Sequence, residues 1–146
     1  MAMTSNTPLY NRDYALWLSQ QLSFIEQGQF ERIDVKNISM QLKSWDNTQR
    51  FQIRENVRQV MTNQLINSAR HFGGDYDLMS DTHSRQVRIV RSLRESPSLK
   101  NYFDECIRDE FPAAVKEAKR RSGRGAVIPD KNQFSAVTVM GRRKLA

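Results

Sequence analysis

Two groups of arginines at helical spacing carry the clearest binding chemistry of this chain. Arg50, Arg54 and Arg58 recur every four residues, so on a helix they would form one stripe. Guanidinium groups match phosphate oxygens as two-pronged hydrogen-bond donors, so the pattern favours a phosphate-binding surface. The second group recurs every three residues and would fan across about half of another helix: Arg85, Arg88, Arg91 and Arg94.

A competing hypothesis is that carboxylates of the same chain neutralise these arginines. The next predicted helix carries acidic residues, and a short Ser-Pro connection would place it antiparallel to the second arginine group. Residues 1–115 hold 14 Lys/Arg and 14 Asp/Glu, which makes internal neutralisation the favoured interpretation. The acidic residues concerned are Asp104, Glu105, Asp109 and Glu110.

The net charge of +7 is confined to residues 116–146, which contain 9 Lys/Arg and 2 Asp/Glu. Basic arms gain affinity for nucleic acid by releasing counterions, and they also bind acidic protein surfaces. We therefore expect nucleic acid or an acidic protein as the partner. The expected contacts in this tail are Lys116, Lys119, Arg120, Arg121, Arg124, Arg142, Arg143 and Lys144.

A polar segment offers weak candidates for metal binding. Two imidazoles and three carboxylates lie within the 13 residues 71–83, and such groups can hold a divalent ion that activates water. Their spacing matches no ligand motif, and Asp81 also suits a helix cap. A solvated loop is therefore the default interpretation. The candidate ligands are His71, Asp75, Asp77 and His83.

Other catalytic arrangements are missing from the pattern. The Gly pair at 73–74 lacks the GK[ST] that completes a phosphate loop. Cys106 shares its helical spacing with Leu99 and Phe103, which predicts a core position and not a nucleophile. We expect no cofactor, and the sequence leans against an enzyme without deciding the question.

Helices must position these residues. Steps of three and four between apolar residues predict an all-α bundle of five or six helices with an irregular basic C-terminal tail. Asn11 or Asp13 would cap the first helix, Gly28 would end it, and Asp34 would cap the second. Asp46 to Thr48 would break the second helix from the third, and Asp81 or Thr82 would cap the fourth. The predicted domain covers 9–121 and the tail 122–146.

Several further local expectations follow. Ser96-Pro97 should start the fifth helix and Pro112 should end or kink it. Trp17, Trp45 and Phe30 are expected to pack inside the protein. The stretch FSAVTVM, residues 134–140, has the composition of a short strand or a docking segment.

Three features of the sequence bear on the compartment of the protein. One cysteine and an N-terminus without an apolar leader segment favour the cytoplasm. No apolar run approaches the roughly 18 residues needed to span a bilayer, so we expect no membrane association. A homo-oligomer is possible on this evidence.

Three motifs in register resemble one bacterial family. LYNRDYALWL (9–18), GQFERIDVKNI (28–38) and SPSLKNYF (96–103) look like the domain-of-unknown-function family number twenty-nine, over about residues 9–118. The resemblance implies a compact α-helical domain without an established activity. It also implies departures, since the family tends to carry His and Trp where this chain has Asn63 and Asn67. The tail after Arg124 has no counterpart in this alignment.

Our leading hypothesis is a non-enzymatic binding module whose basic tail and arginine-rich helices engage nucleic acid or an acidic protein. One alternative is an inhibitor-like or antitoxin-like interaction protein. A second alternative is a small metal-assisted hydrolase or nuclease that uses the 71–83 segment.

Overall fold

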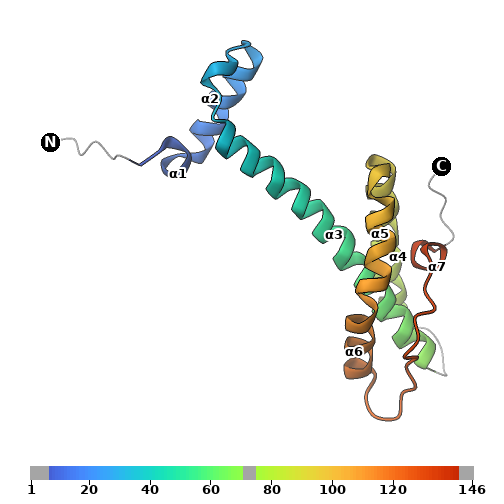
Figure 1. Cartoon of the computed structure of the whole chain (residues 1–146). Helices are drawn as coiled ribbons and strands as arrows, with labels where there is room; N and C mark the ends of the chain where they lie inside the picture. Colours follow the sequence, from blue (N-terminus) through green and yellow to red (C-terminus); the bar gives the residue numbers. More distant parts are fainter. Residues whose placement is uncertain (1–6, 71–74, 142–146) are drawn as a thin grey trace. The chain divides into compact units, whose positions relative to one another are not determined.

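The computed structural model describes residues 7–70 and 75–141, and within these ranges it contains helices and no strand (Figure 1). This confirms the all-α prediction. None of the described helices is long and apolar enough to cross a membrane. The chain divides into an N-terminal unit up to Asn47 and a C-terminal unit from Thr48. The α-helices are α1 (Leu9–Arg12), α2 (Tyr14–Glu26), α3 (Val35–Ala69), α4 (Tyr76–Glu95), α5 (Lys100–Asp109), α6 (Phe111–Ser122) and α7 (Ala136–Met140), with short 3-10 helices η1 (Phe30–Arg32) and η2 (Pro97–Leu99).

The ends of α2 follow the predicted signals. The Asp13 side chain caps the start by accepting a hydrogen bond from the Leu16 amide at 3.0 Å. At the other end Gly28 has a φ of 71°, a left-handed conformation that glycine adopts without steric cost. The chain therefore turns directly after α2 and enters η1.

Asp34 caps α3 and joins it to α2. Its carboxylate accepts hydrogen bonds from the Asn37 amide and from Trp17 Nε1, while its own amide donates to Gln21. The hydrogen bond from the Asn37 side chain, and then the Asn37 amide and Trp17, lower the pKa of Asp34 despite partial burial. Of the aromatic residues expected inside, only Trp17 is buried, because Trp45 and Phe30 remain 65% and 66% exposed. The expectation was wrong for those two, since no described residue of the N-terminal unit covers them.

α3 is continuous through Asp46–Thr48, so the predicted break there was wrong. Asp, Asn and Thr are poor helix formers, but each costs only about 0.5 kcal/mol, and none removes a backbone hydrogen bond as proline does. The apolar pattern changes near this point because α3 passes from a stretch with no buried residue into the core of the C-terminal unit. Buried positions on α3 begin at Ile53, inside the C-terminal unit.

The core of the C-terminal unit is built from α3, α4, α5, α6 and the segment that follows α6. α7 lies beside both α4 and α5 in this unit (Figure 1). Leu99, Phe103 and Cys106 are all buried, as their spacing predicted. The largest fully buried side chains include Phe103, Ile53, Met61, Ile66 and Ile89.

The cap of α4 lies six residues before Asp81, the first of the two predicted caps. Asp75 is the cap, since its side chain accepts hydrogen bonds from the amides of Asp77 and Leu78. Asp81 and Thr82 lie inside the helix, where the Thr82 hydroxyl donates to the Leu78 carbonyl one turn earlier. The prediction was wrong because three aspartates, a residue type that often caps helices, occur in one segment, and the first is the one used.

Both proline signals place helix starts. Pro97 opens η2, which runs into α5, although Ser96 makes no side-chain cap. Pro112 lies in the first turn of α6, where its missing N–H has no partner to lose. α5 ends at Asp109, so the prediction that this proline separates two helices is confirmed.

The segment after α6 belongs to the core up to Gly141. Residues 136–140 form α7 and not a strand, and Ile128, Val139 and Met140 are buried. The side chain of Gln64 on α3 donates a hydrogen bond to the Thr138 carbonyl at 3.0 Å. The expected flexible tail is thus a docked segment over this part of its length. β-branched residues gave the strand-like composition, but a Ser135–Thr138 capping box starts a helix.

Candidate functional site: an arginine-lined groove

A polar groove of about 500 Å³ lies between α3 and α4 in the C-terminal unit. We call it the arginine groove. One side is lined by three of the predicted arginines of α4, and the other by an aromatic, two amides and a carboxylate of α3. Its residues are Phe51, Gln52, Glu55 and Asn56 on α3 and Arg85, Arg88, Arg91, Ser92 and Glu95 on α4.

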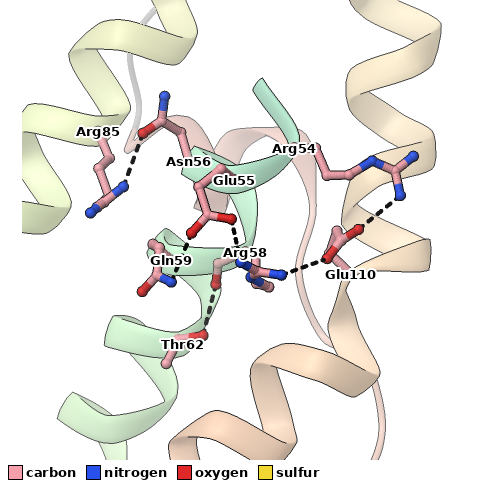
Figure 2. Close-up of polar contacts among 8 residues, drawn as sticks. All are labelled: Arg54, Glu55, Asn56, Arg58, Gln59, Thr62, Arg85 and Glu110. Carbon is pink, nitrogen blue, oxygen red and sulfur yellow. Dashed lines mark hydrogen bonds and ion pairs between the residues drawn. The ribbon is translucent and has the colours of Figure 1, made fainter. Parts of the chain in front are cut away.

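Arg85 is fixed at one end of the groove. Its guanidinium donates hydrogen bonds to Asp81 at 2.8 Å and across to Asn56 at 3.1 Å, and Figure 2 shows the bond to Asn56. Burial opposes ionisation of Asp81, but hydrogen bonds from Arg85 and Asn63 outweigh it and lower the pKa of Asp81. Asp81 therefore stays charged, and Arg85 is held as a rigid positive group beside the opening.

Arg88 and Arg91 are the accessible cations of the groove. Arg91 pairs with Glu95 at 2.9 Å, but both side chains are mostly exposed, so solvent screens the pair and it exchanges readily. Arg88 is exposed and forms no ion pair or hydrogen bond with any residue that the structure describes. Its five N–H donors are available to a ligand.

Glu55 keeps the groove from being uniformly positive. It accepts hydrogen bonds from Arg58 and Gln59 of its own helix (Figure 2). Burial raises its pKa, and these two hydrogen bonds lower it further than burial raises it, so the carboxylate is ionised. Three guanidinium groups against Glu55 and Glu95 leave an excess of one positive charge in the lining.

The first arginine group of α3 contacts residues of α5 and of the α5–α6 junction instead of lining the groove. Glu110, 8% exposed at the junction of α5 and α6, accepts a hydrogen bond from Arg54 at 2.8 Å and lies 3.9 Å from Arg58 (Figure 2). Arg54 also donates to the Tyr102 hydroxyl, and Arg50 lies over the Tyr102 ring at 5.1 Å. The hydrogen bond to Tyr102, and then the hydrogen bond to Glu110, raise the pKa of Arg54.

The expected internal pairing is confirmed for one acid and the first arginine group, since Glu110 pairs with Arg54 and Arg58. Glu110 pairs with α3 and not with the arginines of α4, and Asp104 pairs with Lys100 of its own helix at 2.9 Å. The reason is position, since the α5–α6 junction lies against α3. Arg94 is exposed near the end of α4, outside the lining of the arginine groove.

The cations of the C-terminal segment are partly paired. Lys119 pairs with Asp130, and Arg120 pairs with Glu117. Three others are exposed on α6 or just after it: Lys116, Arg121 and Arg124. The remaining predicted contacts, Arg142, Arg143 and Lys144, lie outside the described residues.

The metal candidates are used for other purposes where the structure describes them. Asp75 caps α4 and pairs with Arg70, and Asp77 lies in the first turn of that helix. His83 is exposed on α4, and His71 lies outside the described residues. No group of three His, Cys, Asp or Glu within the described ranges is arranged to hold an ion.

Sequence reasoning missed the α3 side of the groove. Phe51, Gln52, Glu55 and Asn56 are spaced by one, three and one residues, which places them along one side of a helix. The available signal was Phe51, a large aromatic residue outside the apolar stripe of α3 and 63% exposed. Arg50 and Arg54, which flank it in the sequence, form the more obvious pattern.

Comparison with known proteins places the chain in a family. No curated protein and no solved structure matches it significantly. The family model for the domain of unknown function DUF29 matches residues 9–143. The resemblance was expected only to about residue 118, and the match corrects this because it includes α7 and the segment before it. The chain therefore belongs to the DUF29 family, as its three N-terminal and central motifs indicated.

Proposed function

We propose that this protein is a non-enzymatic binding module that holds the phosphates of a single-stranded nucleic acid in the arginine groove. The observation that carries the proposal is the unpaired Arg88 beside Arg91 and the exposed Phe51. Arginine forks suit phosphate oxygens, and an exposed aromatic ring offers a stacking surface to a base.

The rest of the lining fits the same ligand. Gln52 and Asn56 present amides that can bond to base edges, and the Ser92 hydroxyl adds a further donor. A duplex would hide its bases from Phe51, which is why the proposal specifies a single strand. Arg121 of α6 lies near enough to lower the pKa of Asp81, so positive charge continues beyond the α4 side.

An acidic protein surface is the second candidate, since carboxylates also accept paired hydrogen bonds from guanidinium groups. Phe51 has no role in that case. A cytoplasmic location is part of the proposal and is supported by the single, buried and unpaired Cys106. Nothing in the described residues favours the inhibitor-like or metal-assisted alternatives.

The test is fluorescence anisotropy with a labelled oligo-dT strand and with a duplex of equal length, over a range of salt. The Arg88→Ala/Arg91→Ala variant should lose at least about tenfold in affinity. Its salt slope should fall by roughly 1.4, because two phosphate contacts are gone. Phe51→Ala should weaken binding of the strand and leave the salt slope unchanged.

Arg108→Ala is the matched control, since Arg108 is an exposed arginine of α5 outside the groove. It should bind like the unaltered chain. Truncating the tail would be a poor control because it removes Ile128, Val139 and Met140 from the core. Equal binding by the groove variant and the control contradicts the proposal, and competition by poly-glutamate without any response to Phe51→Ala favours the acidic partner.

A further inference from the structure

The N-terminal unit leaves most of its apolar side chains uncovered. Among its described residues only Trp17 and Gln21 are buried. A unit of this size with one buried aromatic ring is far below the core that a stable domain needs without a further support. Ten large apolar side chains of the unit are exposed by 45% or more: Tyr14, Leu16, Leu18, Leu22, Ile25, Phe30, Val35, Met40, Leu42 and Trp45.

Five of these side chains, together with the half-buried Ile38, form two matching stripes. On α2 the stripe is Leu18, Leu22 and Ile25, with steps of four and three residues. On α3 the stripe is Ile38, Leu42 and Trp45, with the same steps. Both spacings keep three side chains on one face of a helix. Each helix therefore has a narrow apolar seam of the kind that packs against another helix.

Both stripes lie on the same side of the unit. α2 and α3 run antiparallel, since Tyr14 bonds to Gln41 and Gln21 bonds to the start of α3. When each helix is viewed along its axis from its N-terminus, its stripe lies about 70° around the axis from the residues that form these bonds. The direction of this rotation is the same on both helices. In an antiparallel pair, equal offsets of this kind bring the two stripes to one face.

α2 is also unusual in its charge. Residues 14–25 contain no Asp, Glu, Lys or Arg, whereas α4 and α6 are rich in charge. A helix surrounded by water normally carries charged residues on its outer face. Twelve successive residues without charge suit an enclosed position, and they offer nothing to a polyanion or to an acidic protein.

We infer that the two stripes are the contact face for a second copy of this chain, so that the α2 and α3 segments of two copies enclose one four-helix core around a two-fold axis. A two-fold contact pairs a surface with itself, and this surface is uncharged on α2 and self-complementary in its chemistry. The inference is independent of the proposed function.

The available area supports a dimer. The ten exposed side chains offer on the order of 1,000 Å² per copy, of which the stripes supply about half. The Ser and Gln side chains between them widen the face. A standard stable interface takes roughly 800 Å² from each partner, so the stripes supply somewhat more than half of that area and the side chains that flank them supply the rest.

Analytical ultracentrifugation of the full chain tests the inference. The 17.0 kDa chain should sediment with twice that mass. Leu22→Glu/Leu42→Glu should sediment as a monomer, because a dimer would bury four carboxylates without partners. Val127→Glu is the matched control: Val127 is 83% exposed in the C-terminal unit, and this variant should remain a dimer.

Trp45 gives a second readout that needs no stripe variant. Its emission should move to shorter wavelength as the protein concentration rises, since the exposed indole enters the interface. A chain that stays monomeric with no such shift overturns the inference. A dimer that the stripe variant leaves intact overturns it equally, because the two copies then meet through another surface.

Discussion

The two units differ in whether the apolar faces of their helices are covered by other side chains. The C-terminal unit covers the stripes of α3, α4, α5 and α6 with one another and with α7, and 21 of its described residues form a buried hydrophobic core. The N-terminal unit has stripes of similar quality on α2 and α3 but leaves them exposed. An apolar face thus indicates that something must cover it, and the covering chain need not be the same molecule.

The largest expected effect separates the two cores. Phe103→Ala should lower the free energy of unfolding of the C-terminal unit by about 3–5 kcal/mol, since Phe103 is fully buried. Leu22→Ala should change it by less than about 0.5 kcal/mol in dilute solution, where the proposed dimer dissociates. Urea unfolding followed by circular dichroism measures both. Similar losses for the two variants would abolish the distinction between the units.

A smaller effect is expected at Glu110, a buried carboxylate that pairs with the partly exposed Arg54 and Arg58. Glu110→Ala should cost about 1–3 kcal/mol, because it leaves Arg54 and Arg58 without this acceptor. Glu105→Ala removes an exposed carboxylate of α5 and should change the stability by less than about 0.5 kcal/mol. Thermal unfolding of the two variants provides the comparison, and equal melting temperatures would show that Glu110 contributes no more than a surface charge.

In the N-terminal unit the Asp34 cap should matter by about 1 kcal/mol. Asp34→Ala removes the acceptor for the Asn37 amide and for Trp17. Hydrogen exchange should become faster at the start of α3 and stay unchanged within α4. Asp34→Asn keeps an oxygen acceptor and should lose only part of the protection. An unchanged exchange rate in the Ala variant would mean that the cap is not what holds the start of α3.

The smallest expected effect concerns acid. The pKa of Asp81 is lowered in the folded protein, so its contribution to stability is present above the pKa of the unfolded chain, about 4. That contribution is lost as the pH falls through the lower folded pKa. Asp81→Asn should therefore flatten the decline of stability in acid by a fraction of 1 kcal/mol. Urea midpoints measured at several acidic pH values test this, and parallel curves for both proteins would contradict it.

The sequence predicted well wherever one residue type decides the local structure. Asp13, Gly28 and Pro112 act through their own backbone or side chain, and each marks a helix end as expected. It failed where the neighbouring chain decides. Asp46 and Asp81 resemble caps but lie within helices, and Trp45 resembles a core residue but is exposed.

The sequence predicted one side of the candidate site, on α4, and missed the other side, on α3. The three arginines on the α4 side are visible as a repeat, whereas the α3 side depends on which face α4 covers, and that is a tertiary fact. The same holds for Arg54 and Arg58, which have the spacing of a binding stripe but face Glu110, a residue more than fifty positions away.

The docked segment up to Gly141 also sets an order of events during synthesis. Gly141 approaches Gln86 so closely that a Cβ there would lie 2.6 Å from its side chain, and Val139 and Met140 fill the core beside α4. A ribosome that has just made α6 has therefore not yet supplied the last apolar side chains this core encloses. Until Met140 has left the exit tunnel, the nascent C-terminal unit exposes the surface that α7 will cover, and it is then most open to chaperones and proteases.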